Sequence, residues 1–462
     1  VLRHAQAVAR RLSKNPEFDP ILTVFYFPLQ KSIKDVPNPN ANADLNWRYI
    51  HSDNIFSISK STVYRSHVPA SNGFYESSAA ESVENHNIQG EEIELIWTPI
   101  MQFSGVLSKP LNAIWYWLVV FAVLVNHYRK NADKESYLHL HAGDKIAWPL
   151  GFVKKHIWSK AFFWYTEHWA IFGKEIEDSY SKRSVFFRWY MKRIWKLADV
   201  SASISVFTHQ QLQHTYKLPK RMHLFRNPVD TSMFNSRPGT NHNNLNLFST
   251  LFPDIQIQQE TINWLHVSNY DNRKQVPLII NAFNQISASN KDTPMNLILV
   301  GGDASELLAK NPEIDIDSVK SNPRIKIVGK VNPMELSDLM KMCSALILFS
   351  TAENAPCIIA EAQCCGLPII TSSVAGIPEM IVSSGVWFTK GLNEEHLKET
   401  MEQYLTEIKL ESSAYSSSNP AVFKEGNIVS QMDVSEIAMA RFNPQNIGQE
   451  ILSAYLRYTP YQ

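Results

Sequence analysis

Residues 351–372 read TAENAPCIIAEAQCCGLPIITS and place two glutamates, Glu353 and Glu361, with seven residues between them. The apolar run 345–350 that precedes this segment predicts a strand. Pro356 suits the first turn of a helix, because its missing N–H would be unpaired there. The first acid then lies at the end of a strand and the second inside a helix. Such a strand–turn–helix is either a ligand site or simply an element with two solvated acids.

This arrangement can hold a ligand that is rich in hydroxyl groups and carries phosphate. Carboxylates accept paired hydrogen bonds from the vicinal diols of a sugar or a ribose. The helix start between the two acids offers unpaired backbone N–H groups and the positive end of the helix dipole to a phosphate. Sugar, ribose and phosphate are the parts of a nucleotide sugar, so the segment favours a ligand of that class.

The composition is that of an ordinary globular protein. With 462 residues, 44% hydrophobic and 19% charged, the chain is too long for one core, and two domains are expected. The 44 Lys and Arg residues balance 44 Asp and Glu residues, which disfavours nucleic acid as a partner. The cysteines lack metal-ligand spacing and predict reduced, buried thiols in a cytoplasmic protein. They are Cys343, Cys357, Cys364 and Cys365.

Two features near the beginning bear on leaders and membranes. The chain begins at Val1 rather than Met, and VLRHAQAVARRL predicts a helix, so a preceding leader can be neither seen nor excluded. The strongest apolar run, residues 113–125, is shorter than the roughly 20 residues that span a bilayer. We therefore expect a buried core helix there, with a membrane-embedded helix as the alternative.

Apolar runs alternate with helical segments in both halves of the chain. In the second half, strands are expected at residues 263–268, 296–302, 324–329, 345–350 and 368–372, and helices at 276–288, 333–343 and 356–365. Strands separated by helices predict an α/β protein with parallel, doubly wound sheets. Residues 235–260 resemble a linker, so the predicted domains are 1–258 and 259–445. Ligands of such folds bind at the carboxyl edges of the strands, which predicts a cleft between the two domains.

Polar or small residues follow three of the expected strands at that edge. They are Arg273 and Lys274, Gly301 and Gly302, and Gly329 and Lys330. The two adjacent cations either neutralise a diphosphate or form a solvated basic pair. Glycines allow a ligand to approach the backbone closely, although they also occur in ordinary turns.

The first half supplies three histidines near predicted strands. His168 ends an apolar strand beside Glu167, where a structural role is the alternative to a catalytic one. His139 and His141 alternate along a strand, so their side chains should share one face. No cluster of cysteines or carboxylates accompanies them, and a metal site is disfavoured.

Together these blocks resemble the retaining glycosyltransferases of family 4, which have the GT-B fold of two doubly wound domains facing a central cleft. The resemblance is strongest over residues 264–382, through HVSNYDNRKQVPLIINAF and through VGKVNPMELSDLMKMCSALILFSTAENAPCIIAEAQCCGLPIITSSVAGIPEMI. The first half matches more loosely, through HAQAVARRL, LHLHAG, TEHW, ADVSASIS and RNPVDTSMF in order. ARFNPQNIGQEILSAY resembles the family's terminal helix, so residues 446–462 should cross back to the first domain.

The resemblance implies a hexosyltransferase that moves a sugar from a nucleotide diphosphate sugar to a hydroxyl of a sugar, lipid-linked or small-molecule acceptor. His168 would lie near the reacting carbon, Lys274 on the diphosphate and Glu353 on the sugar hydroxyls. Glu361 would hold the ribose diol. Because Lys274 and helix N-termini can replace a divalent ion, neither metal nor cofactor is expected. The other implied donor contacts are Asn269, Arg273, Gly301, Gly302, Gly329, Lys330, Asn354, Ala355 and Cys357, and the implied acceptor-side residues are His4 and His141.

Two departures from the family pattern keep alternatives open. Many members carry a Gly-Arg pair after the first donor-domain strand, where this chain has Ser268 and Asn269. The glycine-rich loop and first strand expected ahead of the opening helix would precede Val1. A nucleotide-sugar epimerase of the same fold and an inactive sugar-nucleotide-binding protein are the alternative functions.

Residues 182–196, KRSVFFRWYMKRIWK, interleave cations with aromatic residues. This pattern is typical of a helix that packs its aromatic residues on a sheet. It also suits peripheral contact with an anionic membrane, where a lipid-linked acceptor could be reached. The expected location is therefore cytoplasmic, with contact at the inner face of the membrane as the second interpretation.

Overall fold

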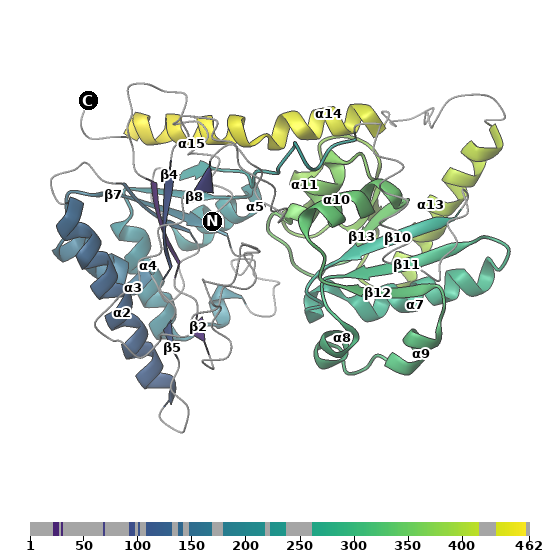
Figure 1. Ribbon diagram of the computed structural model, residues 1–462, viewed down its shortest axis with the longest axis horizontal. Helices are drawn as coiled ribbons and strands as arrows, with labels where there is room; N and C mark the ends of the chain where they lie inside the picture. The colour runs from purple at the N-terminus through teal and green to yellow at the C-terminus, as the bar shows by residue number, and fades with distance from the viewer. Residues whose placement is uncertain are drawn as a thin grey trace, which may run out of the picture. The chain divides into compact units, whose positions relative to one another are not determined.

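The computed structural model describes residues 22–26, 29–30, 68–69, 92–97, 100–101, 108–131, 137–141, 147–168, 179–217, 222–236, 261–414 and 431–458. Contacts divide the chain into two compact units (Figure 1). The first comprises Val1–Pro228 with Pro444–Gln462, and the second comprises Val229–Asn443. The predicted opening helix with His4, and residues 237–260 of the predicted linker, lie outside the described residues.

The second unit contains a six-stranded parallel sheet. Its strands are β10 (Ile262–Val267), β11 (Met295–Val300), β12 (Ile325–Gly329), β13 (Ala345–Leu348), β14 (Ile369–Ser372) and β15 (Val386–Thr389). Their spatial order is β12-β11-β10-β13-β14-β15, which is 3-2-1-4-5-6 when they are counted along the chain. This is the order of doubly wound nucleotide-binding domains. The order reverses between β10 and β13, so the carboxyl ends of these two strands are where a ligand is expected to bind.

Helices cover both faces of this sheet (Figure 1). They are α7 (Val276–Ser289), α8 (Ala304–Lys310), α9 (Ile316–Ser321), α10 (Pro333–Met342), α11 (Cys357–Cys364), α12 (Ile377–Met380), α13 (Glu394–Ala414) and α14 (Gln431–Phe442). The helices predicted at 276–288, 333–343 and 356–365 agree with α7, α10 and α11 to within one residue at each end.

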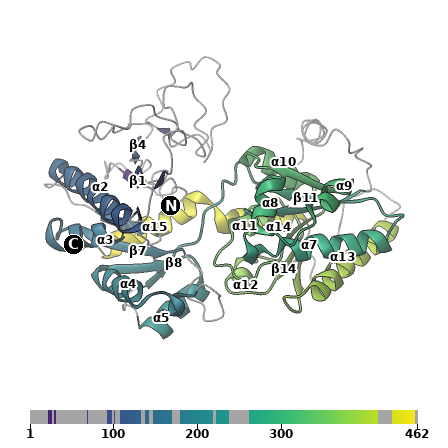
Figure 2. The same cartoon turned by 90° about the horizontal axis from the view of Figure 1, so that it is seen from below.

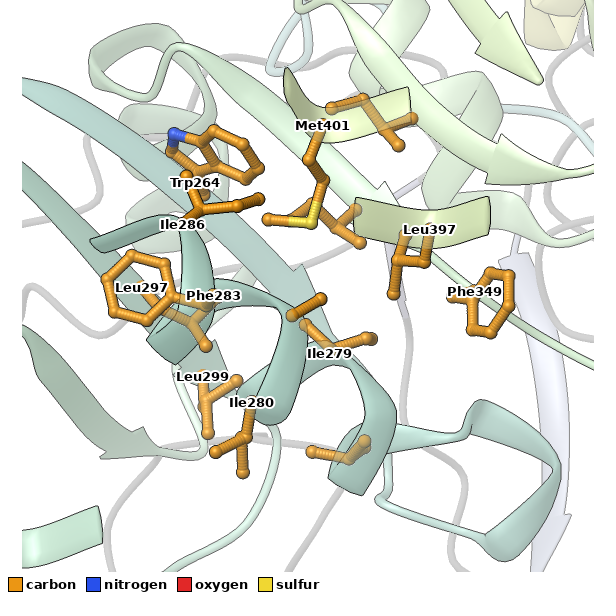
Figure 3. Packing of buried hydrophobic residues seen from close by; sticks show 14 of the residues in the cluster. Trp264, Ile279, Ile280, Phe283, Ile286, Leu297, Leu299, Phe349, Leu397 and Met401 are labelled. Atoms are coloured by element: carbon orange, nitrogen blue, oxygen red, sulfur yellow. The ribbon is translucent and has the colours of Figure 1, made fainter. Parts of the chain in front are cut away.

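The core of the second unit forms where α7 and α13 meet the sheet (Figure 3). Apolar residues recur at helical spacing on α7, and Ile279 and Phe283 are fully buried there. Met401 on α13 packs in the same cluster as Trp264 of β10. Because parallel strands are covered on both faces, β10 and β11 read as nearly continuous apolar runs.

The first unit contains a four-stranded parallel sheet in the order β6-β7-β8-β9. Its strands are β6 (Tyr137–His141), β7 (Phe162–Glu167), β8 (Val200–Ser203) and β9 (Met222–Leu224), and its helices include α2 (Ser108–Asn131), α3 (Ala147–His156), α4 (Val185–Leu197) and α5 (Val206–Tyr216). A smaller sheet pairs β1 (Leu22–Tyr26) with β4 (Glu92–Trp97) in parallel and β4 with β3 (Val68–Pro69) antiparallel. The short strands β2 (Leu29–Gln30) and β5 (Ile100–Met101) also pair.

The apolar helix α2 is buried on one face rather than all round. Tyr116, Val120 and Leu124, spaced four residues apart, belong to the core of the first unit. Ile114 and Leu118 on another face are 59% and 48% exposed. The expectation of a buried core helix at residues 113–125 therefore holds for only part of its surface. Among the described residues, no helix combines the length and apolar character needed to cross a membrane.

The division between the units falls earlier than residue 258. The backbone N–H of Val229 donates to the carbonyl of Phe442 at 3.0 Å, and Ser337 Oγ donates to the carbonyl of Met233 at 2.8 Å. These contacts attach the segment after Pro228 to the second unit, so the change of unit occurs before the polar stretch that resembled a linker.

The terminal helix α15 (Pro444–Tyr458) belongs to the first unit. Its residues Ile447 and Ile451 are buried in one cluster with Phe162 and Trp164 of β7. The chain therefore returns to the first unit after completing the second.

Candidate functional site

Lys274 and Glu353 meet at the point where the strand order reverses. Lys274 lies on the loop after β10 and Glu353 on the loop after β13, and Lys274 Nζ donates to Glu353 Oε1. Ser350 Oγ donates to the same carboxylate oxygen at 3.1 Å. The two charged side chains are only 16% and 12% exposed, so solvent screens their interaction weakly. An ammonium and a carboxylate fixed here can receive an anionic and a hydroxyl-bearing group side by side.

Backbone hydrogen bonds join the loops that carry this pair. The N–H of Thr351 donates to the carbonyl of Arg273 at 2.9 Å, which ties the loop after β13 to the loop after β10. The N–H of Gly376 donates to the carbonyl of Glu353 at 3.1 Å, which adds the loop after β14. The position of the pair is therefore set by three strand ends rather than by one flexible loop.

The loop after β10 is anchored by a buried tyrosine. Tyr270 is fully buried, and its hydroxyl donates to the carbonyl of Gly302 at 3.0 Å. Its backbone has φ 59°, and Gln275 at the other end of the loop has φ 46°. Side chains other than glycine rarely adopt this left-handed region, and such strain concentrates at ligand sites. The loop that presents Lys274 is thus held in a costly conformation at both ends.

Gly301 allows the ends of three strands to approach one another. It has φ 123°, and a Cβ at this position would lie 1.9 Å from the carbonyl oxygen of Ser268. Its own N–H donates to the carbonyl of Gly329 at 2.7 Å. A glycine is therefore required here by contact between backbones. The sequence left two interpretations of Gly301 and Gly302, the close approach of a ligand and an ordinary turn. For Gly301, the contact with the Ser268 carbonyl is a sufficient reason for glycine.

Arg273 and Lys274 take different partners. Arg273 forms an ion pair with Asp271 at 3.6 Å, and Lys310 forms another at 3.4 Å. Asn269 Nδ2 donates to the same carboxylate at 2.8 Å. Partial burial would raise the pKa of Asp271, but the Asn269 hydrogen bond and the two cations outweigh it and lower the pKa. The structure brings Lys274 together with Glu353, and Arg273 and Asn269 together with Asp271.

A further ion pair joins α8, which follows β11, to the loop after β12. Lys330 Nζ donates to Glu306 Oε1 at 2.6 Å, with side chains 44% and 43% exposed. Glu306 also completes the capping box of α8 with Asp303. Lys330 and Gly302 are thus neighbours of one acidic side chain, since a Cβ on Gly302 would lie 2.7 Å from Glu306 Oε2.

The helix α11 carries the second glutamate of the 351–372 segment. Glu361 is 4% exposed, and Asn354 and Ala355, just before the helix, are 5% and 7% exposed. Cys357 at the helix start is half-buried. Burial and the nearby Glu361 carboxylate raise the pKa of Cys365 to about 12. That thiol therefore stays protonated at neutral pH and is a poor nucleophile.

The histidines of the first unit lie together at the carboxyl ends of β6 and β7. His141 Nδ1 and His168 Nε2 are 2.9 Å apart, and the rings of His139 and His141 are stacked with centroids 4.0 Å apart. The prediction that His139 and His141 share one face is confirmed. The backbone N–H of His168 donates to Glu167 Oε1 at 2.9 Å, so the buried carboxylate fixes the chain where His168 leaves the strand. Within the described ranges, no group of three or more His, Cys, Asp or Glu residues is placed to hold a metal ion.

Sequence reasoning missed His266, which links the two strands beneath the Lys274–Glu353 pair. Its ring is fully buried, with Nδ1 2.9 Å from the carbonyl of Ile347 and Nε2 2.8 Å from Ser268 Oγ. Since a carbonyl only accepts, Nδ1 carries the proton and Nε2 accepts from the serine in the neutral ring. A polar residue inside an otherwise apolar strand beside the predicted site was the available signal.

His266 should make the stability of the second unit depend on pH. Burial, opposed by the bond to the Ile347 carbonyl and reinforced by the Lys274 charge, lowers its pKa from 6.5 to about 4. As pH falls, the unfolded chain takes up a proton near 6.5, whereas the folded ring does so only near 4. The stabilisation is therefore complete above pH 6.5 and is lost between 6.5 and 4, by up to about 3 kcal/mol.

Urea unfolding at pH 7.5 and pH 4.5 measures this loss. In the wild-type protein the free energy of unfolding should be lower at pH 4.5 than at pH 7.5. His266→Gln should remove most of this difference. An equal pH dependence in both proteins would assign the effect to other groups.

A separate groove of about 400 Å³ occurs in the described part of the second unit. It is lined by Ser384, Gly385, Val386, Trp387, Phe388, Gln403 and Glu407, on β15 and α13 rather than at the switch in strand order. Glu407 already accepts from Trp387 Nε1 at 2.9 Å and from Gln403 Nε2 at 2.8 Å. Because ligands of doubly wound sheets bind at the switch in strand order, the edge with Lys274 and Glu353 is the stronger candidate site.

Residues 248–418 match the family "Glycosyl transferases group 1". The chain is also 31% identical over 122 residues to N-acetyl-alpha-D-glucosaminyl L-malate synthase of Bacillus anthracis. That similarity covers 25% of this chain and 29% of the relative. The region predicted from residues 264–382 to resemble such a donor domain lies inside the matched range.

Solved structures agree on the fold. Sucrose-phosphate synthase from Thermosynechococcus elongatus is similar with a TM-score of 0.59 at 15% identity, over 78% of this chain and 82% of that chain. A glycosyltransferase from Rickettsia africae has a TM-score of 0.57, and Anabaena HepE in complex with UDP and glucose has 0.56. Both are 15% identical and cover 79% of this chain and 86% of theirs. The predicted fold class, GT-B, is confirmed.

Proposed function

We propose that this protein is a retaining glycosyltransferase of family 4 that moves a sugar from a nucleotide diphosphate sugar to a hydroxyl group, in glycan, polysaccharide or glycolipid biosynthesis. The observation that carries the proposal is the contact between Lys274 and Glu353 where the strand order reverses, within the region that matches the group 1 family. Support comes from the similar Anabaena HepE, which has been solved with UDP and glucose and with UDP-glucose.

In this mechanism the protein supplies positioning and charge rather than a nucleophile. The ammonium of Lys274 would bind the diphosphate and stabilise the negative charge that grows as the glycosidic bond breaks. Lys274 and Ser350 both donate to Glu353 Oε1, which fixes the carboxylate so that Oε2 can accept from sugar hydroxyls. Glu361 would accept from the ribose diol. His168, oriented by His141, would lie beside the donor sugar.

The same groups argue for a reaction without metal or cofactor. Lys274 and the positive end of the α11 dipole can neutralise a diphosphate, which is the task a divalent ion performs in other transferases. We expect activity to change less than about twofold in excess EDTA. Loss in EDTA that Mg²⁺ or Mn²⁺ restores would contradict this part of the proposal.

A thermal-shift screen against UDP-, GDP- and ADP-sugars tests the donor class. A ligand that binds only the folded state at 100 times its Kd adds about 2.7 kcal/mol to stability, which is readily detected. One nucleotide class should raise the unfolding temperature clearly more than the others. If no nucleotide sugar raises it at millimolar concentration, the proposed function fails.

Glu361→Ala should weaken donor binding about 10- to 100-fold, because hydrogen bonds to a charged group contribute roughly 1.5–3 kcal/mol. Calorimetric titration with the nucleotide sugar found in the screen gives the ratio of Kd values. Glu399→Ala is the matched control. The Glu399 side chain is 49% exposed and forms an ion pair with Lys390. Donor affinity and activity retained in Glu361→Ala would remove the assigned role.

Two alternatives give different outcomes with the same reagents. An epimerase of this fold would convert the nucleotide sugar to a new one without any acceptor, which chromatography of the nucleotides detects. An inactive binding protein, suggested by Ser268 and Asn269 in place of a Gly-Arg pair, would bind the donor and transfer to no acceptor.

A further inference from the structure

Three helices of the first unit contain no acidic residue, in a chain whose Lys and Arg residues equal its Asp and Glu residues in number. The helices α2, α3 and α4 are neighbours, with α3 in contact with both of the others (Figure 2). The cations among their described side chains are Arg129, Lys155, Arg188, Lys192, Arg193 and Lys196, together with Lys154, which is paired with Asp199 at 3.3 Å. This part of the surface is therefore strongly positive although the whole chain is neutral.

Aromatic rings connect the same three helices at the surface. Trp117 of α2 contacts Phe152 of α3 with centroids 5.7 Å apart, and one turn away Trp148 contacts Phe186 of α4 at 5.5 Å. Phe186 then stacks with Trp189 at 5.9 Å. We call these five residues the aromatic ribbon. Four of them are 42–54% exposed, namely Phe152, Trp189, Trp148 and Phe186.

Packing of the first unit does not account for the ribbon. On α4, Tyr190, Met191, Ile194 and Trp195 are the residues buried against the core. Phe186 and Trp189 lie on the opposite side of that helix, 54% and 48% exposed. The helix thus packs one set of aromatic residues on the sheet and presents a second set to solvent. Exposed apolar area of this extent marks an interaction surface.

Aliphatic side chains extend the ribbon. Val185 on α4 is 74% exposed, and Ile114 and Leu118 on α2 are 59% and 48% exposed. The guanidinium of Arg193 lies 4.3 Å from the ring centroid of Trp189, so cations border the apolar area directly. Trp and Phe beside Lys and Arg are the composition of elements that lie in the headgroup region of a bilayer. A nucleic acid would use the cations and rings, but it gives no reason for exposed valine, isoleucine and leucine.

We propose that α2, α3 and α4 form a docking surface for an anionic lipid bilayer, with the aromatic ribbon entering the headgroup region and the surrounding cations facing lipid phosphates. The surface goes beyond the single segment 182–196 and is separate from the Lys274–Glu353 site. If the transferase activity also holds, the acceptor would be reached at the lipid surface, and only that consequence rests on the proposed function.

Sedimentation of the full chain with vesicles tests the proposal. The protein should bind vesicles of phosphatidylcholine with phosphatidylglycerol at least 10-fold more tightly than vesicles of phosphatidylcholine alone, and the difference should shrink in 0.5 M salt. Equal binding to both kinds of vesicle, or binding to neither, would overturn it. So would tighter binding to duplex DNA or RNA than to anionic vesicles, or a stable dimer in solution that Phe186→Ser disrupts.

Two variants separate the apolar and the charged parts. Phe186→Ser with Trp189→Ser should lower binding to anionic vesicles at least 10-fold. Lys192→Gln, Arg193→Gln and Lys196→Gln together should lower it about 100-fold, since each cation near such a surface contributes roughly fivefold. Lys390→Gln with Phe388→Ser, an exposed cation and an exposed aromatic residue of the second unit, is the matched control and should bind like the wild type.

Two further measurements keep these results interpretable. Circular dichroism melts establish that each variant is folded. The thermal shift produced by nucleotide sugars should be unchanged in all of them, so failure of the lipid surface and failure of the donor site give different results. Unchanged vesicle binding in both folded surface variants would refute the proposal.

Discussion

Lys274→Met should lower kcat/KM for sugar transfer by about 100- to 1,000-fold, which is the usual cost of losing one group that stabilises charge in a transition state. Lys274 Nζ is bound to Glu353 at the strand-order switch, where both side chains are largely shielded from solvent. Most of the loss should appear in kcat, because the charge on the leaving diphosphate grows as the bond breaks. Steady-state kinetics with the donor identified by thermal shift measures it.

The same substitution should have a smaller effect on stability. It leaves the Glu353 carboxylate without its cation, which costs roughly 1–3 kcal/mol for a group that is mostly buried. Lys390→Met is the matched control, because that side chain is 80% exposed and its ion pair with Glu399 is 3.5 Å long. The control should keep wild-type activity to within twofold.

A double-mutant cycle with Glu353→Gln establishes whether the two residues act as a unit. The combined variant should lose much less than the product of the two single losses, because each substitution disrupts the same contact. A Lys274→Met enzyme that keeps kcat and changes only KM by a few fold would contradict the proposed stabilisation of the leaving group.

Gly301→Ala should destabilise the second unit by about 3–5 kcal/mol, which combines the cost of a left-handed residue with that of forcing two backbones apart. The added Cβ would lie 1.9 Å from the Ser268 carbonyl oxygen, and backbone has no other rotamer to adopt. For a domain of this size, the unfolding temperature should fall by about 10 °C or more. Thermal unfolding followed by circular dichroism measures the fall.

Gly329→Ala provides the comparison that isolates the contact. Gly329 also has a positive φ, 85°, but a Cβ there meets no atom within 4 Å. Its substitution should therefore cost only the conformational part, about 1–2 kcal/mol. Equal melting temperatures for the two variants would show that the close approach at Ser268 does not control stability.

The second unit illustrates what the sequence predicts well. The strands at 263–268 and 345–350 are visible as short apolar runs, and α7 keeps a clear spacing of apolar residues, so the types of these elements are confirmed. The ends of β10 and α7 agree to within one residue, whereas β13 ends at Leu348, two residues earlier than predicted. The sequence also places Lys274 after the first of these strands and Glu353 after the fourth, both at the carboxyl edge of the sheet. Placing Lys274 against Glu353 needs the additional fact that these two strands are neighbours, which the structure supplies.

Other features could not be predicted because they depend on a partner far along the chain. His266 forms a hydrogen bond with the Ile347 carbonyl, and Tyr270 forms one with the Gly302 carbonyl. Contacts between residues so far apart in the chain leave no periodic pattern in the sequence. Arg273 and Lys274 are adjacent in sequence and lie on the short 3-10 turn Asn272–Lys274. Their side chains nevertheless pair with different acids, Arg273 with Asp271 and Lys274 with Glu353. The sequence also does not indicate which face of α2 is exposed, because apolar residues occupy every side of that helix.

The return of α15 to the first unit has a consequence for biosynthesis. Ile447, Ile451 and Ala454 complete a cluster with Trp164 and Phe225, residues that leave the ribosome more than two hundred positions earlier. During translation, that side of the nascent sheet stays uncovered until the whole second unit has been made. The nascent chain therefore exposes these aromatic side chains for many seconds at ordinary elongation rates of about 5–20 residues per second. Chaperones that bind exposed aromatic residues can act during this interval. The interval ends when α15 has been synthesised and packs on the sheet.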